Sequence, residues 1–529
     1  MKRFLWLGFV LSVYLICTGC GETFRPIIIP NPPTFPNPQA AHTVVAISDN
    51  GAIVPGSAMV IDVSGDTDVS QASVGLAPVH AVQQTASQVL VVNHSVTGAL
   101  ADSITKLDFS GTTINIATTI SLPANSAPNF VAVAPTDTLA YVTLPNYVPP
   151  SVGVVNTSTN GVIWTIPVGP KPDALAVTPD KSKLYVVNQG DGTLSAFNTA
   201  DRSARPITGA LTSAPIWLSA RSDSQAVYVL ELNGTLAWLN TSSSAGPDVL
   251  TETSNPLIQV PFATTMTYDP NLVRLYIAGG QQMAIVDVSQ SPPQFLAMVP
   301  IPPIALGPPN STVPANATAV AALPDGTRAY VASYAAVTSQ LNISAVSGDG
   351  TTATYAYTLT AGHDLTPGVS VTVTGTGAGF DGTFLVAAIV SGTAACPATC
   401  FQVPNTTSGN GTAGSGAGSN IFPQITVVWA TSNTVKTTVG MPPFPDATVQ
   451  GSQYYVEACA NARFRFMMAA AGDSTRAYLS SCDGGNVNIV DTTSDDYIEN
   501  LPGPTSARAP IPPSSQNPPQ NPVFLIAGP

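Results

Sequence analysis

Three short apolar runs between residues 172 and 199 decide the fold. They read PDALAVTPD at 172–180, KLYVVN at 183–188 and TLSAFNT at 193–199. Val, Leu, Tyr and Phe, which strands favour, fill the runs, and Pro, Asp, Gly and Asn lie between them, where turns are expected. With a fourth run at 204–208, this stretch predicts a unit of four strands.

The same order of runs recurs about every 40 residues along the chain. A four-stranded repeat of this length is typical of a β-propeller blade, because one blade cannot bury both its faces until neighbours pack against it. A β-solenoid would have shorter repeats, and a string of β-sandwiches would have longer ones. The other units span 77–123, 128–168, 215–251, 264–300, 318–333 with 425–440, and 464–501.

The two ends of the chain complete one further unit. Residues 43–75 contain three predicted strands and lack the first one, and the last nine residues, NPVFLIAGP at 521–529, align with KPDALAVTP at 171–179. We therefore predict an all-β propeller of four-stranded blades whose ring is closed by the N- and C-terminal strands. The repeat count gives eight blades. Seven is the alternative, in which the outlying blade packs elsewhere.

One segment interrupts the period and divides the propeller. The first part is predicted at 43–334, a small inserted β domain at 335–424, and the remainder at 425–529, which contains a Pro-rich linker at 502–522 and the closing strand. Runs typical of strands favour a domain over a decorated loop. The Gly/Ser/Thr tract at 408–419 is predicted to be a flexible loop.

The N-terminus has the pattern of a secretory signal. A basic pair precedes an apolar run that is too short to span a bilayer, and residues 17–21 read CTGCG. This resembles a bacterial lipobox, although Cys17 replaces the usual Leu, and predicts a signal peptide at 1–20 with Cys20 as the lipidated residue. Residues 21–42 are Pro-rich and predict an extended stalk. We expect an extracytoplasmic lipoprotein of the bacterial cell envelope, attached to the membrane by its lipid alone.

The composition excludes some classes of partner. Only 9% of the residues are charged and the net charge is −13, so the chain has no surplus of cations for a nucleic-acid backbone. With 42 Gly and 49 Pro in 529 residues, many turns are expected and a helical protein is disfavoured.

Four cysteines remain beyond the signal. An even number in an oxidising compartment predicts disulfides, and we favour the pairs Cys396–Cys400 and Cys459–Cys482. A zinc site at Cys396 and Cys400 is disfavoured, because neither a His nor a second Cys pair lies near them in the sequence.

The repeats resemble a known family. AVTPDKSKLYVVN at 176–188, PDGTRAYVA at 324–332 and IVDT at 489–492 are similar to the YVTN-type β-propeller repeat, over about 43–334 and 425–501. The resemblance implies the fold and leaves the activity open, because these motifs are strand and turn positions. Secreted lactonases share this type of propeller.

A search for catalytic patterns finds few candidates. The four histidines have no metal-ligand spacing, nucleophile elbows and nucleotide-binding loops are missing from the sequence, and we predict neither a metal nor another cofactor. The predicted inner strands are mostly apolar and small. The polar residues expected at the channel are His80, Arg221, Tyr268 and Arg465.

The sequence thus favours a monomeric binding or scaffolding module over an enzyme. Its loops and the inserted domain would contact an unidentified protein or glycan. A secreted lactonase-like hydrolase that uses the mouth of the channel is the alternative.

Overall fold

The computed structural model describes residues 42–51, 54–94, 102–243, 246–254, 257–306, 312–365, 367, 369–393, 396–449, 455–502 and 521–528. The predicted signal peptide, Cys20, the stalk apart from His42, and most of the linker at 502–522 lie outside these residues. Among the helices that are described, none is long and apolar enough to cross a bilayer.

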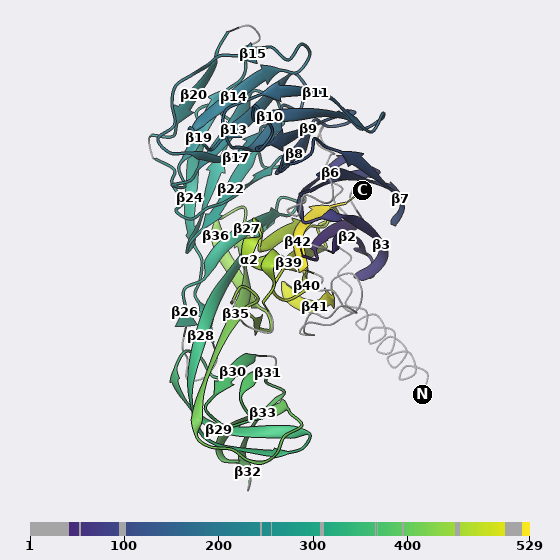
Figure 1. Cartoon of the computed structure of the whole chain (residues 1–529). Coiled ribbons are helices and arrows are strands. Elements are labelled where there is room, and N and C mark those ends of the chain that lie inside the picture. Colours follow the sequence, from purple (N-terminus) through teal and green to yellow (C-terminus); the bar gives the residue numbers. More distant parts are fainter. Residues whose placement is uncertain are drawn as a thin grey trace, which may run out of the picture.

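The described chain is almost entirely β and forms a propeller (Figure 1). Seven sheets are separate blades, each with four antiparallel strands. In chain order they consist of β1 (Thr43–Asp49), β2 (Pro55–Asp62), β3 (Thr67–Leu76) and β42 (Asn521–Ala527); β4 (Pro78–Thr85), β5 (Gln88–Asn93), β6 (Ser103–Ser110) and β7 (Thr113–Ser121); β8 (Val131–Val133), β9 (Leu139–Leu144), β10 (Ser151–Asn156) and β11 (Gly161–Pro167); β12 (Pro172–Val177), β13 (Lys183–Asn188), β14 (Thr193–Asn198) and β15 (Ala204–Arg205); β17 (Pro215–Ala220), β18 (Ala226–Glu231), β19 (Leu236–Asn240) and β20 (Asp248–Glu252), with the short β16 (Ile207–Thr208) at its edge; β21 (Met266–Asp269), β22 (Arg274–Gly279), β23 (Gln282–Asp287) and β24 (Gln294–Pro300); and β38 (Phe466–Ala470), β39 (Arg476–Ser481), β40 (Asn486–Asp491) and β41 (Asp496–Pro502).

The remaining sector of the ring belongs to a larger, curled sheet of eleven strands. Its inner part consists of β27 (Asn316–Ala322), β28 (Arg328–Asp349), β35 (Gly414–Trp429) and β36 (Thr434–Gly440). The innermost strands contact one another in the order β42, β4, β8, β12, β17, β21, β27, β38 and back to β42. The repeat count of eight units therefore agrees with seven separate blades plus one sector of the curled sheet. A two-stranded sheet of β25 (Ile304–Ala305) and β26 (Thr312–Val313) precedes β27.

The C-terminal strand closes the ring as predicted. β42 pairs antiparallel with β1, with Val45 opposite Ile526 and Ile47 opposite Phe524. The first blade is thus built from both ends of the chain, and opening the ring there requires breaking this ladder.

A buried tyrosine in the second strand of several blades fastens that blade to the next one. Tyr330 in β28 donates a hydrogen bond to Asp495, at the β40–β41 turn of the neighbouring blade, and Arg328 pairs with the same carboxylate through its Nη1 at 2.6 Å. Lys436 is also bound to this carboxylate. The same arrangement recurs twice: Tyr185 and Arg205 bind Asp248, and Tyr478 and Arg476 bind Asp66. We call each such group a clasp.

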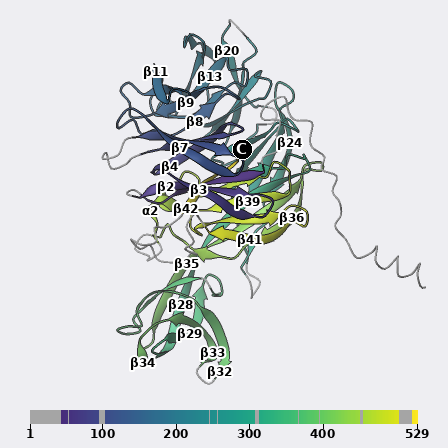
Figure 2. The ribbon, with the colours of Figure 1, turned by 90° about the vertical axis from the view of Figure 1, so that its right-hand side faces the viewer.

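The inserted segment forms an arm that projects from the ring (Figures 1 and 2). β28 and β35 run unbroken from the blade into the arm and pair along their length, from Arg328 opposite Trp429 to Ile343 opposite Gly414. The other strands of the arm are β29 (Thr352–Ala361), β30 (Ser370–Thr374), β31 (Gly382–Leu385), β32 (Ala388–Thr393), β33 (Cys396–Pro404) and β34 (Ser408–Asn410), and β37 (Phe444–Pro445) pairs with β35 near its base.

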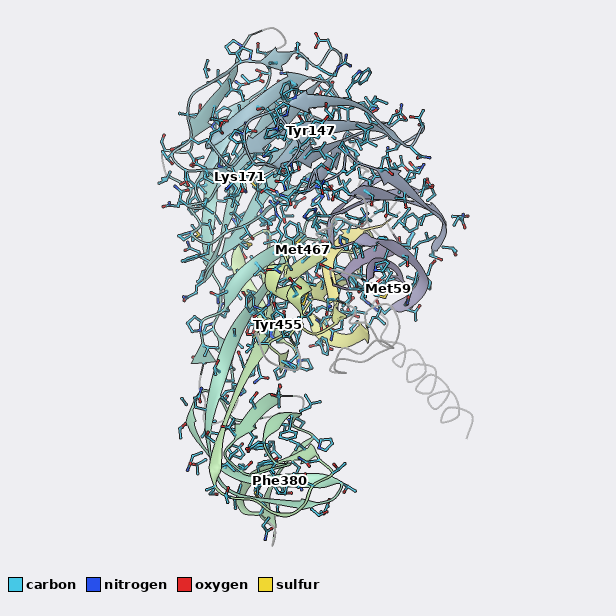
Figure 3. The ribbon with its side chains drawn as sticks, in the orientation of Figure 1. Met59, Tyr147, Lys171, Phe380, Tyr455 and Met467 are labelled. Carbon is cyan, nitrogen blue, oxygen red and sulfur yellow. A yellow bond between two sulfur atoms is a disulfide. The ribbon has the colours of Figure 1, made fainter. Side chains whose placement is uncertain are left out.

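The arm encloses a hydrophobic cluster of its own. Tyr355 stacks on Phe401 with ring centroids 4.7 Å apart, and Phe380, marked in Figure 3, is buried with them. The Cys396–Cys400 disulfide lies on β33. The arm is therefore packed internally and is more than a long surface loop.

The predicted flexible loop at 408–419 is wrong, because most of this tract is strand in β34 and β35. Its glycines are needed for close packing. A Cβ at Gly418 would lie 2.2 Å from the Ser370 carbonyl oxygen, and one at Gly416 would lie 3.1 Å from Leu341 Cδ1. The Gly-rich composition here reflects close packing between strands and does not indicate mobility.

Candidate binding site at the channel mouth

A cluster of aromatic rings fills the centre of the ring at one end. His80 of β4 stacks on Phe130, just before β8, with centroids 3.6 Å apart, and its ring lies 4.9 Å from that of Phe524 of β42. Phe464, just before β38, packs edge-on against Phe524 and against Trp217 of β17. These five rings come from five sectors of the propeller and meet across its axis. We call them the aromatic plug.

The aromatic plug changes the role expected of His80. The imidazole is buried, and burial, with the nearby Arg463 guanidinium, lowers its pKa well below the ordinary value. His80 is therefore neutral at pH 7 and packs as an aromatic ring.

The plug lies on one face of the propeller, which we call the mouth face. In each blade this face has the turn between the second and third strands and the connection to the next blade. The arm replaces one of those turns, and a short helix, α2 (Glu457–Asn461), lies in the connection before β38. The Cys459–Cys482 disulfide joins α2 to the segment that follows β39. Both disulfides thus have the predicted pairing.

Arg463 spans the mouth from the α2 connection to the opposite blades. Its guanidinium pairs with Asp173 of β12, donates to the carbonyl oxygen of Ile216 at 3.2 Å and lies over the rings of Phe130, Trp217 and Phe464. Burial raises the pKa of Asp173, and the charge and hydrogen bonds of Arg463 oppose that rise. This ion pair holds the α2 connection across the ring.

Arg465 makes a second ion-pair group beside the first. Its Nε donates to Asp483 at 2.6 Å and its Nη2 donates to Asp446 at 2.8 Å. Its guanidinium carbon lies 5.3 Å from the centroid of the Tyr334 ring, on β28 where the arm leaves the blade. Arg465 therefore lies on the mouth face.

A cavity of about 350 Å³ opens between these groups at the base of the arm. Tyr334 of β28, Phe464, Phe466 and both arginines form much of its wall. Threonine side chains and the α2 connection complete the lining: Thr264, Thr318, Thr448, Cys459, Ala460 and Ala462. We call this the arm-base cavity.

The other two predicted channel residues lie at the opposite face. Arg221 follows the end of β17, pairs with Asp223 at 2.7 Å and donates to the carbonyl oxygen of Val288. Tyr268 lies on β21, and its hydroxyl is 3.0 Å from that of Ser222, which is in the same turn as Arg221. The structure therefore separates these two residues from His80 and Arg465 and gives them partners within turns. Across the described part of the chain, no three His, Cys, Asp or Glu side chains gather closely enough to hold a metal ion.

Sequence reasoning missed Arg463, Asp173 and Tyr334. Asp173 and Arg463 are 290 residues apart, and Tyr334 lies within a run that reads as ordinary strand. The available signal is the run ARFRF at 462–466, where two cations alternate with aromatic residues immediately before an inner strand.

Comparisons with known proteins show the fold and no family. No family model matches the chain, and no curated protein sequence matches it. Among solved structures, AztD of Citrobacter koseri is 10% identical with a TM-score of 0.50, over 92% of this chain and 97% of that one. The dihydro-heme d1 dehydrogenase NirN in complex with DHE is 10% identical with a TM-score of 0.49, over 89% and 75%. Hydrazine synthase of Kuenenia stuttgartiensis is 13% identical with a TM-score of 0.42, over 79% and 96%.

At 10% identity the likeness to AztD shows a shared fold only. The three structures belong to differently named proteins, so no single function follows from them. The YVTN-type assignment, which no family model identifies, stays a proposal.

Proposed function

We propose that the protein is a lipid-anchored, extracytoplasmic propeller of the YVTN-repeat kind that acts as a binding or scaffolding module for a protein or glycan. Two disulfides suggest a location outside the cytoplasm, where such bonds persist. The anchor at Cys20 rests on the sequence alone.

The observation that carries the proposal is the position of the arm. It replaces a second-to-third-strand turn, so it rises from the same face that has the arm-base cavity. That face also exposes apolar side chains on its turns: Val148 is 88% exposed and Phe262 is 82% exposed. Insertions on a rigid scaffold are common recognition elements.

The exposed side of the arm is polar and carries few charges. Thr372 and Thr374 of β30 face solvent, and their hydroxyls lie 2.8 Å from that of Thr383 and 3.1 Å from that of Ser415. Residues 329–435 contain neither Lys nor Arg, and their three Asp include Asp349 and Asp381, which hydrogen-bond to turns. Such a surface favours contacts through hydroxyl groups over electrostatic steering.

The same geometry disfavours a hydrolase that uses the mouth. The aromatic plug and the Arg463–Asp173 pair occupy the place where a catalytic centre on the channel axis would lie. A lactonase-like hydrolase, the alternative suggested by the sequence, would need a catalytic site away from the channel axis.

Site-specific photo-cross-linking in the producing cells tests the proposal. A photoreactive amino acid is placed at Thr372 or Ser415 of the arm, and for comparison at the exposed Thr165 on β11 or Thr438 on β36. We expect discrete adducts from the arm positions and none from the outer strands. Protease and glycosidase digestion of an adduct then shows whether the partner is protein or glycan.

A charge variant provides the matched control. Thr374→Lys places a cation beside the reporter at Ser415 and should abolish its adduct, whereas Thr438→Lys should leave the adduct intact. Adducts of equal yield from arm and outer strands, or none from either, would contradict a role for the arm in binding.

A further inference from the structure

The arm-base cavity has hydrogen-bonding groups that the protein itself leaves unused. Within the described residues, the hydroxyls of Tyr334 and Thr264 and the Nη1 of Arg465 have no hydrogen-bond partner, although all three residues line the cavity. Each can donate a hydrogen bond, and the two hydroxyls can also accept one. A ligand rich in hydroxyl and carbonyl oxygens would satisfy them.

The charges around the cavity are already matched. Arg463 is paired with Asp173, and Arg465 is paired with both Asp446 and Asp483. An anionic ligand would have to compete with these carboxylates, and a cationic ligand would be opposed by the two guanidinium groups. The arrangement therefore favours an uncharged ligand.

The shape of the cavity adds a third constraint. A volume of about 350 Å³ is at the lower end of the range for small-molecule sites. Its lining includes Tyr334, which is partly exposed, together with the buried Phe464 and Phe466 and residues that carry hydroxyl groups. A pyranose ring has C–H faces that suit aromatic side chains and hydroxyl edges that suit hydrogen-bonding groups.

We propose that the arm-base cavity binds one ring of a neutral saccharide. The inference rests on the proposed binding function and assigns it a glycan ligand. The arm, which rises directly from Tyr334, would contact the remainder of the glycan chain.

The test is titration of the full chain, by calorimetry and by ligand-observed NMR, with methyl glycosides of glucose, galactose and mannose and with N-acetylglucosamine. Glucuronate and glucosamine serve as charged counterparts. We expect one neutral sugar to bind, and its charged counterparts to bind at least about tenfold more weakly.

Variants that remove single hydroxyls locate the site. Tyr334→Phe preserves the ring beside Phe466 and should weaken binding about fivefold to tenfold, the effect of one hydrogen bond, and Thr264→Val should act in the same direction. Tyr147→Phe, in the β9–β10 turn away from the cavity (Figure 3), should change nothing.

The inference is overturned if no neutral sugar binds the wild-type chain at about 20 mM, which would put Kd above the millimolar range. It is also overturned if Tyr334→Phe binds as the wild type does, or if glucuronate binds more tightly than its neutral counterparts. Arm-dependent cross-links that persist in any of these cases would leave the proposed binding function standing without the saccharide. If neither saccharide binding nor arm-dependent cross-links are observed, the saccharide site and the proposed binding function are both contradicted.

Discussion

Breaking the clasp around Asp495 should be among the most damaging single changes in the ring. Asp495→Ala removes a carboxylate whose side chain is 1% exposed and leaves the Arg328 guanidinium, 2% exposed, without its counter-ion. Removing one partner of a buried ion pair costs about 3–5 kcal/mol. Lys436, whose side chain is 28% exposed, can turn to solvent and adds little. We therefore expect a loss of about 4 kcal/mol in the free energy of unfolding.

Thermal unfolding followed by circular dichroism measures this loss. At about 2.1 cal/mol/K per residue, the entropy of unfolding of a chain this long is about 1 kcal/mol/K, so Tm should fall by about 4 °C. The exposed Asp201, which hydrogen-bonds only within its own turn, is the matched control, and Asp201→Ala should shift Tm by less than about 1 °C.

A rescue variant separates charge from packing. The triple change Arg328→Met, Tyr330→Phe and Asp495→Leu removes the buried charges together with the tyrosine hydroxyl and should recover most of the lost stability. If Asp495→Ala melts within 1 °C of the wild type (about the effect of a neutral surface change), the clasp does not fasten the blades as described.

Three other results are expected. Burial lowers the pKa of His80, so below pH 6.5 the unfolded chain binds a proton at this residue that the folded chain does not bind. The free energy of unfolding should therefore be highest above pH 6.5 and should fall as the pH drops towards the pKa of the folded state. In denaturant titrations at pH 5 to 7, His80→Phe should reduce the dependence of the free energy of unfolding on pH by up to about 1.4 kcal/mol per pH unit. An unchanged dependence on pH would count against a buried neutral imidazole. Replacing Cys459 and Cys482 by Ser opens a loop of 23 residues and should cost about 3 kcal/mol in urea unfolding, and a cost near zero would mean that α2 is held by other contacts. Truncation after Pro502 removes β42 and exposes the edge of β1, so size-exclusion chromatography should show dimers or aggregates, and a stable monomer would contradict closure by this strand.

The repeat and the closing strand could be predicted because their signals are local. A period of strands is visible along the chain, and NPVFLIAGP aligns with KPDALAVTP wherever the two segments lie in space. An even count of cysteines predicts disulfides, and the structure has the two favoured pairs. These features need no knowledge of which blades face each other across the ring.

The site depends on distances that only the closed ring creates. Arg463 meets Asp173 and Ile216 because the ring brings the last blade opposite earlier ones. His80, predicted as a polar channel residue, becomes part of the aromatic plug because other blades place rings around it. The residue type alone does not indicate that the imidazole is surrounded by aromatic rings.

A crystal structure of the full chain with the saccharide selected by titration tests the central claim most directly. The account predicts rings of His80, Phe130, Trp217, Phe464 and Phe524 in contact across the axis, and ligand density beside Tyr334 at the base of the arm. An open, water-filled channel that holds the ligand on the axis, with Arg463 turned away from Asp173, would contradict it.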